Sequence, residues 1–392
     1  PMPLPFCRSN LSSAACAGLG AFLLAAALPA CASTGAASQS TTAQASEPAN
    51  RTANPSAAGV PIDHAAWREL GLAWDWAGFP VVSEGGFISD FALTEDRLFI
   101  QESASIVSAL DATTGRLDWT VEVAGPLTRF VGMVPDGTRL LVPSESELYE
   151  FASSTGNLMS RQKLTRVVNT RPAVVGSLAI FGTASGELIA HDRDLGLTRW
   201  RYALSGPIKS EPIVLDGTII GAVSDDGDVI ALDASNAAAV GRTRIAGGVG
   251  APITTDTFHL FVASLDQSVY AITSFGGERV WRVRTEDPIR MPGILADNLY
   301  IFSTPGRGVV GVEPFSGDLV WEIKDLGETA PVGMLGGELL TWNGRTATLI
   351  DAERGEVVAQ ADLPGIRSIT IGDNDTVYAI TDANTVLRFR QR

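Results

Sequence analysis

The chain has 392 residues, of which 45% are hydrophobic and 19% are charged, and its formal net charge is −15. A chain this acidic repels a phosphate backbone, so its charge argues against a nucleic-acid partner. All three cysteines (Cys7, Cys16 and Cys31) lie in the first 31 residues, so the rest of the chain can hold no disulfide and no cysteine-based metal or catalytic site.

Residues 1–31 have the pattern of an export signal. Arg8 precedes the apolar run AGLGAFLLAAALPA, whose length is more typical of a signal peptide than of a membrane-spanning helix. The residues Leu28–Cys31 resemble a bacterial lipobox, which implies that Cys31 is lipidated and becomes the new N-terminus after cleavage. A plain secretory signal cleaved near the sequence ACA is the alternative. Ala32 is not the acidic residue that retains some lipoproteins at the inner membrane, which favours the periplasmic face of the outer membrane.

Residues 32–60 are predicted to form a flexible tether. Ser, Thr, Ala and other small or polar residues dominate this segment, and its apolar residues show no period. Such a composition buries too little surface to offset the entropy of ordering the chain. We therefore expect the folded domain to occupy residues 61–392.

From about residue 100 onward, a motif returns roughly every forty residues. A turn glycine lies 38 to 41 residues from the next, with an alanine at one position, in the series Gly115, Gly156, Gly196, Ala237, Gly277, Gly317 and Gly355. Four of these residues are followed four positions later by a tryptophan: Trp119, Trp200, Trp281 and Trp321. A second marker repeats with the same period, at Pro172, Pro212, Pro252, Pro292 and Pro331. Each repeat has room for four short strands, which is typical of a β-propeller blade.

The number of strands predicts an all-β propeller of eight four-stranded antiparallel blades. Seven repeats are complete, and the residues after Leu363 supply only three further strands. The strand-like run at residues 70–79, which contains Trp76, would complete the eighth blade and pair the two ends of the domain. Closure with seven blades is the alternative. In either ring we expect the tryptophans, Trp76 included, to pack against the neighbouring blade, where a turn backbone accepts from the buried indole N–H. The turn glycines are expected to be structural residues of the same blade junctions.

The segment Ala109–Trp119, ALDATTGRLDW, resembles the tryptophan-docking motif A-x-D-x-x-T-G-x-x-x-W of the PQQ-like propeller repeat family. The likeness extends over about residues 70–392. One branch of this family is the quinoprotein dehydrogenases, and the other is the BamB-like, non-enzymatic lipoproteins of outer-membrane β-barrel assembly. The quinoprotein branch implies a vicinal disulfide over its cofactor, and the cysteine-free domain cannot form one.

No residue is predicted to be catalytic, to bind a metal or to hold a cofactor. The acidic segments SDDGD (224–228) and GDNDT (372–376) fit hairpin turns better than calcium loops, because a calcium loop needs more oxygen ligands at set spacings. His64, His191 and His259 are far apart in the sequence and have no nucleophile suggested by spacing.

The resemblance therefore implies an envelope scaffold that binds protein partners, in the setting of β-barrel assembly. We expect the contacts on the loops that lead from each outer strand to the next inner strand. Arg171, Lys209 and Arg290 lie on three of these loops and are candidate partner-binding residues; that they are ordinary solvated charges is the favoured alternative. The alternative functions are a quinoprotein-like oxidoreductase and a cell-surface ligand-binding lipoprotein.

The lipobox generates the first prediction. The substitution Cys31→Ser removes the thiol that accepts the lipid, so the protein is expected to move from the membrane fraction to the soluble fraction of fractionated cells. Cys16→Ser, in the same signal, is the matched control and should leave the protein with the membranes. Retention of the Cys31→Ser variant on membranes would contradict the lipobox.

Overall fold

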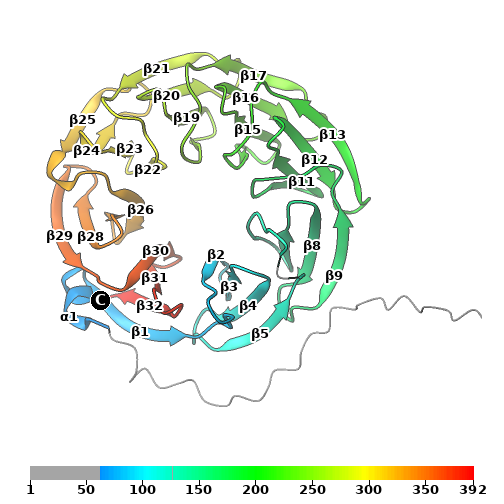
Figure 1. Cartoon of the computed structure of the whole chain (residues 1–392). Coiled ribbons are helices and arrows are strands. Elements are labelled where there is room, and N and C mark those ends of the chain that lie inside the picture. Colours follow the sequence, from blue (N-terminus) through cyan, green and yellow to red (C-terminus); the bar gives the residue numbers. More distant parts are fainter. Residues whose placement is uncertain (1–61, 126) are drawn as a thin grey trace, which may run out of the picture. The chain divides into compact units, whose positions relative to one another are not determined.

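The computed structural model describes residues 62–125 and 127–392. The predicted signal peptide, Cys31 and the predicted tether lie outside the described residues. The described chain forms a ring of eight antiparallel four-stranded sheets, as Figure 1 shows. The prediction of an eight-bladed propeller is confirmed, and the seven-bladed alternative is wrong.

The blades follow one another around the ring in chain order, with the strands of each running from the centre outward. Blade 1 is β2 (Ile88–Leu93), β3 (Arg97–Glu102), β4 (Ile106–Asp111) and β5 (Leu117–Glu122). Blade 2 is β6 (Val134–Asp136), β7 (Arg139–Pro143), β8 (Glu147–Ala152) and β9 (Leu158–Lys163). Blade 3 is β10 (Ala173–Val175), β11 (Leu178–Gly182), β12 (Glu187–Asp192) and β13 (Leu197–Ala203). Blade 4 is β14 (Ile213–Val214), β15 (Ile219–Val223), β16 (Asp228–Asp233) and β17 (Ala239–Arg244).

The second half of the ring repeats this order. Blade 5 is β18 (Thr254–Thr255), β19 (His259–Ser264), β20 (Ser268–Thr273) and β21 (Arg279–Arg284). Blade 6 is β22 (Ile294–Ala296), β23 (Leu299–Thr304), β24 (Gly308–Val312) and β25 (Leu319–Ile323), followed by the short helical turn η2 (Lys324–Leu326). Blade 7 is β26 (Ala330–Leu335), β27 (Glu338–Trp342), β28 (Thr346–Asp351) and β29 (Glu356–Asp362). Blade 8 is β30 (Ile366–Gly372), β31 (Thr376–Thr381), β32 (Val386–Gln391) and the N-terminal strand β1 (Leu72–Gly78).

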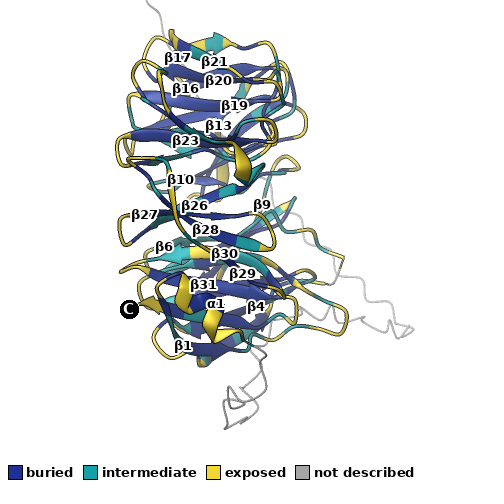
Figure 2. Cartoon of the chain, turned by 90° about the vertical axis from the view of Figure 1, so that its left-hand side faces the viewer, coloured by how far each residue is buried: buried dark blue, intermediate teal, exposed yellow. Residues whose placement is uncertain are grey.

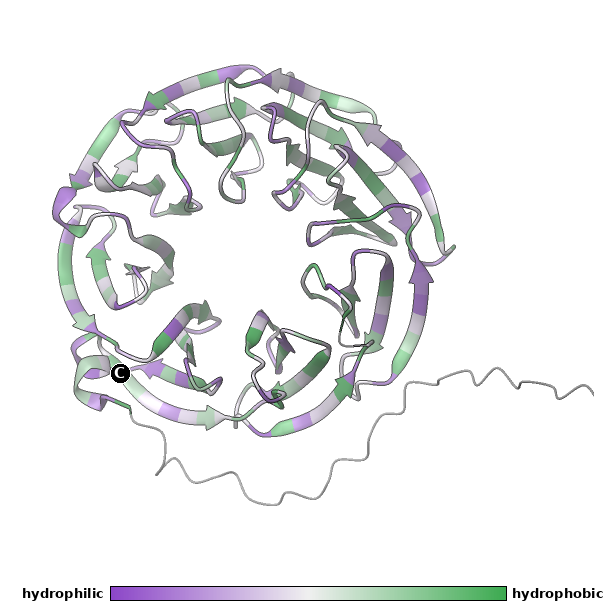
Figure 3. Cartoon of the chain, in the orientation of Figure 1, coloured by the Kyte–Doolittle hydropathy of each residue, from purple (hydrophilic) through white to green (hydrophobic). Residues whose placement is uncertain are grey.

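The position of a strand in its blade decides its composition. The second and third strands lie between two neighbouring blades and are apolar on both faces; in β15, for example, all five residues of IIGAV are buried. The outer strands alternate, as in β13, where every second residue of LTRWRYA is exposed. Figure 3 shows this change from mostly hydrophobic middle strands to mixed outer strands, and Figure 2 shows buried residues inside the blades with exposed residues at the turns.

Neighbouring blades are joined by a repeated contact between an outer strand and a turn, which we call the clamp. In four junctions the indole Nε1 of the outer-strand tryptophan donates to the carbonyl oxygen three residues before the turn glycine or alanine of the next blade. These bonds are Trp119 to Ser153 (3.0 Å), Trp200 to Ala234 (2.7 Å), Trp281 to Pro314 (2.7 Å) and Trp321 to Ala352 (2.8 Å). At the junction of blades 8 and 1, Trp76 packs on Gly115, but its Nε1 has no hydrogen-bond partner among the described residues.

Glycine is favoured at the turn position for two reasons. Gly156 has a φ of +70°, which residues with a Cβ adopt only at a cost, and a Cβ there would lie 2.6 Å from the Trp119 ring. The corresponding distance is 2.7 Å at Gly317 and 2.5 Å at Gly355. Ala237 is the exception, with a φ of 60°. Its partner Trp200 is only partly buried, whereas Trp119, Trp281 and Trp321 are 8% exposed.

Three junctions lack a tryptophan and are joined differently. Between blades 2 and 3, the side-chain amide of Gln162 donates to the carbonyl of Arg193 (2.7 Å), which lies three residues before Gly196. Between blades 4 and 5, Gly241 lets the backbones meet directly, and the amide N–H of Gly276 donates to the carbonyl of Val240 (2.8 Å).

The last junction, between blades 7 and 8, is covered by the helix α1 (His64–Glu69). Blade 8 has no turn between its third and fourth strands, because its fourth strand, β1, comes from the N-terminal side of the domain. Asp63 caps the helix by accepting from the N–H groups of Ala65 and Ala66. Trp67 stacks on Phe389 of β32 with ring centroids 3.8 Å apart. Both belong to one hydrophobic cluster, against which Ala359 of blade 7 also packs.

The ring is closed by the pairing of β1 with β32. Leu72 lies opposite Gln391 and Gly78 opposite Val386. Asp75 of β1 adds ion pairs to Arg388 (3.0 Å) and Arg390 (2.7 Å). This antiparallel pairing leaves no open seam between the two ends of the domain.

The clamp generates a prediction about stability. Gly156→Ala should lower the free energy of unfolding by about 2–4 kcal/mol, because the new methyl group strains the left-handed backbone and overlaps the Trp119 ring. The matched change Ala237→Gly, at the same position of another blade, should be neutral or stabilise by up to about 1 kcal/mol. Urea unfolding measures the change in unfolding free energy for both variants, provided that the slope of free energy against urea concentration stays the same. Equal effects of the two substitutions would contradict the clamp.

Candidate partner-binding face

Eight connections between blades gather on one side of the ring, which we call the loop face. Each leads from the outer strand of one blade to the inner strand of the next, and they span residues 79–87, 123–133 (position 126 is not described), 164–172, 204–212, 245–253, 285–293, 324–329 and 363–365. Several are fixed by a fully buried aliphatic side chain, such as Val168, Ile208 or Ile289. The backbone adds further bonds, as where the Ile208 N–H donates to the Thr183 carbonyl (3.0 Å). These connections are therefore preorganised surfaces rather than loose loops.

The three candidate partner-binding residues all lie on the loop face, but they do not form one free cationic cluster. The Arg171 guanidinium pairs with Asp90 of β2, and its Nε lies 3.8 Å from Glu211 on the next loop. Lys209 pairs with Asp225 at 2.5 Å. Arg290 is exposed and forms no ion pair within the described residues. Two of the three charges are thus compensated locally, and Arg290 is the one that is available to a partner.

A cavity of about 650 Å³ opens beside Arg171, between blade 1 and the connections at residues 123–133 and 164–172. Hydrogen-bonding groups line it, including Ser89, Asp90 and Gln101, together with the aromatic ring of Phe130. The Asp90 carboxylate accepts from the backbone N–H of Met133 (2.6 Å) and from Arg171. The cavity therefore offers both donors and acceptors to a ligand or to an inserted side chain.

Burial raises the pKa of Asp90 above its ordinary value, and the Arg171 guanidinium and two backbone N–H groups oppose this shift only in part. Sequence reasoning found Arg171 but missed Asp90, which lies 81 residues away. The only signal for Asp90 was an isolated carboxylate in the otherwise mostly apolar strand ISDFAL.

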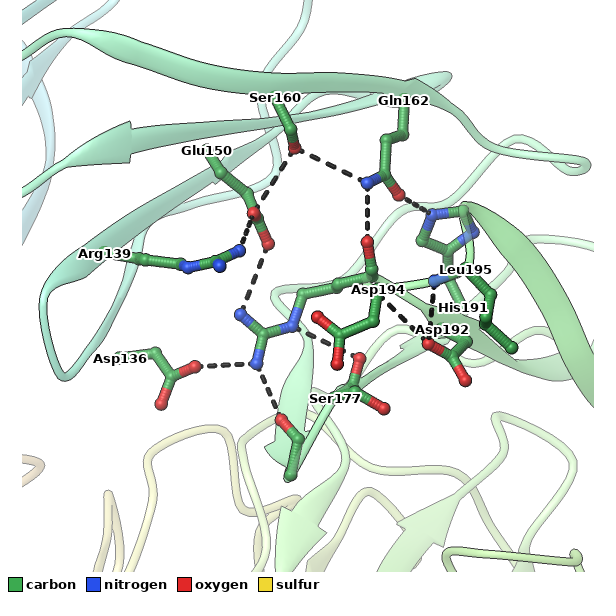
Figure 4. A network of polar contacts seen from close by, with 12 residues as sticks. Asp136, Arg139, Glu150, Ser160, Gln162, Ser177, His191, Asp192, Asp194 and Leu195 are labelled. Atoms are coloured by element: carbon green, nitrogen blue, oxygen red, sulfur yellow. Dashed lines mark hydrogen bonds and ion pairs between the residues drawn. The ribbon is translucent and has the colours of Figure 1, made fainter.

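A buried polar cluster lies elsewhere, between blades 2 and 3 (Figure 4). Glu150 is fully buried and accepts from Arg139 (2.6 Å) and Arg193 (3.3 Å), and Arg193 also binds Asp136 (2.7 Å). Ser160, which stands where other blades have a tryptophan, donates to Glu150 at 3.3 Å. The carboxylate and both guanidinium groups are used within the cluster, so we interpret it as part of the blade junction and not as a reaction centre.

The three histidines remain separate in the fold. His191 places its Nε2 2.6 Å from the side-chain oxygen of Gln162, its Nδ1 has no partner among the described residues, and burial lowers its pKa. His259 lies 2.9 Å from the Asp256 carboxylate, and His64 packs edge-on against Trp74. None of the three lies in a cluster of three or more His, Cys, Asp or Glu residues suited to a metal ion, within the described residues.

The two acidic segments form hairpin turns. Residues 224–228 connect β15 to β16, with the Ser224 N–H donating to the Asp228 carbonyl (2.9 Å). Residues 372–376 connect β30 to β31, with Asn374 and Asp375 in the left-handed region. In residues 62–392, leaving out position 126, no helix has the length and apolar character needed to cross a membrane.

Comparison with protein families gives one match that covers most of the ring. A model of the family described as outer membrane protein assembly factor BamB matches residues 144–240 and 220–392. The outer membrane protein assembly factor BamB of Yersinia pestis is 26% identical over 201 residues, which cover 47% of this chain and 50% of that protein. The chain therefore spans about half the length of this curated relative.

Solved propellers have similar folds. The crystal structure of BamB from Moraxella catarrhalis has a TM-score of 0.65 at 19% identity and covers 78% of this chain and 96% of that one. The computationally designed Ika8 protein has a TM-score of 0.66 at 12% identity, over 80% and 100% of the two chains. The C-terminal WD40 domain of Sif2 has a TM-score of 0.62 at 12% identity, and the match covers 81% of this chain and 98% of that one. At these identities the likeness describes the fold alone.

The Asp90–Arg171 pair generates a prediction about pH. In Arg171→Leu, burial of Asp90 is no longer opposed by the guanidinium, so the folded-state pKa of Asp90 rises further above its unfolded value. A carboxyl whose folded-state pKa is raised costs stability as the pH rises from its unfolded-state pKa to its folded-state pKa. The variant should therefore lose little near pH 4 and about 1–2 kcal/mol at pH 7, a range reduced for the partial exposure of Arg171.

Chemical unfolding at a series of pH values measures this difference. The double variant Asp90→Asn/Arg171→Leu is the control and should recover most of the stability lost at pH 7. A loss in Arg171→Leu that is the same at pH 4 and pH 7 would mean that the guanidinium acts through packing and not through the carboxylate.

Proposed function

Because the chain belongs to the family of the outer membrane protein assembly factor BamB, we propose that it is a non-enzymatic propeller scaffold that takes part in outer-membrane protein assembly. The match of the family model over residues 144–392 is the observation that carries this proposal. The protein binds a component of the β-barrel assembly machinery and holds it in position at the membrane. A lipid on Cys31 anchors the scaffold to the periplasmic face of the outer membrane, with residues 32–60 as the tether.

The loop face is the proposed contact surface. Its connections are held in place by buried residues, so a partner binds without first ordering them. Arg290 supplies an unpaired charge, and Lys209 and Arg171 supply charges that exchange their present carboxylate partners for those of the bound protein. The cavity beside Asp90 takes one inserted side chain of the partner.

The two alternative functions have less support. A quinoprotein-like oxidoreductase of this family needs a vicinal disulfide over its cofactor, and all three cysteines precede residue 32. A ligand-binding lipoprotein is favoured by one observation, the cavity of about 650 Å³ with its mixture of donors and acceptors. Binding of a small polar ligand there, with no protein captured by the loop face, would support that second candidate.

The proposal predicts where the protein crosslinks in intact cells. A photoreactive amino acid at position 290 or 209 should capture an outer-membrane β-barrel protein of the assembly machinery, identified by mass spectrometry. The matched position is 354, on the opposite face, where Arg354 is as exposed as Lys209 and also ion-paired (side chains 69% and 67% exposed). The same capture from position 354, or capture of no assembly component from positions 290 and 209, would contradict the proposal.

A further inference from the structure

The face opposite the loop face carries three exposed phenylalanines on blades 5 and 6. Phe258, Phe275 and Phe315 are 67%, 56% and 64% exposed. We call these three residues the phenylalanine patch. Phe258 lies on the turn between β18 and β19, Phe275 on the turn between β20 and β21, and Phe315 on the turn between β24 and β25.

The three residues are neighbours in space. The Ser274 N–H donates to the Phe258 carbonyl (2.8 Å), which brings the turn of Phe275 beside that of Phe258. His259 follows Phe258 and contacts the Phe315 ring across the blade junction in a T-shaped arrangement, with centroids 5.4 Å apart. The three exposed rings therefore lie on adjoining turns of two neighbouring blades.

The propeller fold does not require these phenylalanines, as the other blades demonstrate. The position two residues before the turn glycine or alanine is polar wherever it is not Phe275 or Phe315, namely Thr113, Ser154, Asp194, Ser235 and Glu353. The residue before the second strand is polar or glycine in the other seven blades: Asp96, Thr138, Ser177, Thr218, Asn298, Gly337 and Asp375. Large apolar residues at these turns cost solubility, so their concentration at one place points to an interaction site.

The turns that carry the patch are held rigidly. Asp256 accepts from the backbone N–H groups of Phe258 (2.9 Å) and His259 (2.6 Å). The indole of Trp281 binds the Pro314 carbonyl directly before Phe315, and the direct contact of blades 4 and 5 fixes the turn of Phe275. Because these turns are already ordered, little conformational entropy is lost when a partner binds the patch.

Acidic side chains surround the patch. The turns of blades 5 and 6 on this face, with the first residue of β21, carry five carboxylates (Asp256, Glu278, Asp297, Glu313 and Asp318) and one guanidinium (Arg279). This charge repels an anionic membrane surface, and it also repels the same patch of a second copy of the chain. The complementary partner is apolar in the middle and basic at its edges.

We propose that the phenylalanine patch binds an extended polypeptide segment that presents aromatic or branched aliphatic side chains flanked by Lys or Arg. The aromatic rings bury the apolar side chains, and the five carboxylates attract the flanking cations and raise the rate of encounter. Val280, Leu319 and Val320, at the beginnings of β21 and β25, are also exposed and extend the apolar surface along the outer strands. This site is separate from the loop face and does not depend on the function proposed for that face.

Fluorescence anisotropy with labelled synthetic peptides tests the proposal. The probe alternates Val, Phe and Tyr with Ser and Thr and carries Lys at both ends; a second probe has Glu in place of Lys. The purified protein should bind the Lys-flanked peptide at least about tenfold more tightly than the Glu-flanked one, and added salt should reduce the difference.

The variant Phe258→Thr/Phe275→Ser/Phe315→Thr replaces the patch with residues that other blades carry at the same turns. It should keep the urea midpoint of the wild type and bind the Lys-flanked peptide at least about tenfold more weakly. Leu195→Thr is the matched control, since Leu195 is 59% exposed on the corresponding turn of blade 3, and it should bind as the wild type does.

Three outcomes would overturn the proposal. The first is equal binding of the Lys-flanked peptide by the wild type and the triple variant, or no binding by either. The second is loss of self-association in the triple variant, measured by sedimentation, which would make a second copy of the chain the occupant. The third is patch-dependent binding to anionic phospholipid vesicles, which would make a membrane the occupant.

Discussion

The ring depends on one repeated contact, in which a side-chain N–H of an outer strand donates to a fixed carbonyl of the next blade. That carbonyl always lies three residues before a turn residue in the left-handed region, and the donor is an indole in four junctions and the Gln162 amide in a fifth. An indole both buries a large apolar area and satisfies a buried carbonyl, so a single residue supplies two stabilising terms. Because this contact locates each blade against the next, it also sets where every turn of the ring is displayed.

At the junctions without a tryptophan, other contacts also hold neighbouring blades together. The Glu150–Arg193 cluster joins blades 2 and 3 beside Ser160, and Gly241 brings two backbones together where no side chain fits. Helix α1 covers the place where the missing turn of blade 8 would lie. With the ring held in these ways, its two sides are free to differ: one presents the connections with Arg171, Lys209 and Arg290, and the other presents the aromatic turns of blades 5 and 6.

The repeat made the fold predictable from the sequence, because a forty-residue period with room for four short strands is typical of a propeller blade. The three strands left over after Leu363 predicted closure by residues 70–79, and β1 does pair with β32. The sites were less predictable because they join residues from different repeats. Asp90 meets Arg171 across two blade junctions, and the patch combines turns of blades 5 and 6. The role of Gln162 in joining blades 2 and 3 could not be predicted either, since Gln162 lies two positions beyond Ser160, the residue that aligns with the tryptophans.

The most direct test of the clamp is hydrogen exchange of the indole N–H groups, followed by NMR on protein labelled with ¹⁵N-tryptophan. The indole protons of Trp119, Trp200, Trp281 and Trp321 are predicted to exchange far more slowly than that of the partly buried Trp74, because each is bonded to a carbonyl of the neighbouring blade. Exchange of those four protons at the rate of Trp74 would show that the indoles are not bonded to the neighbouring blades and that other contacts join the ring.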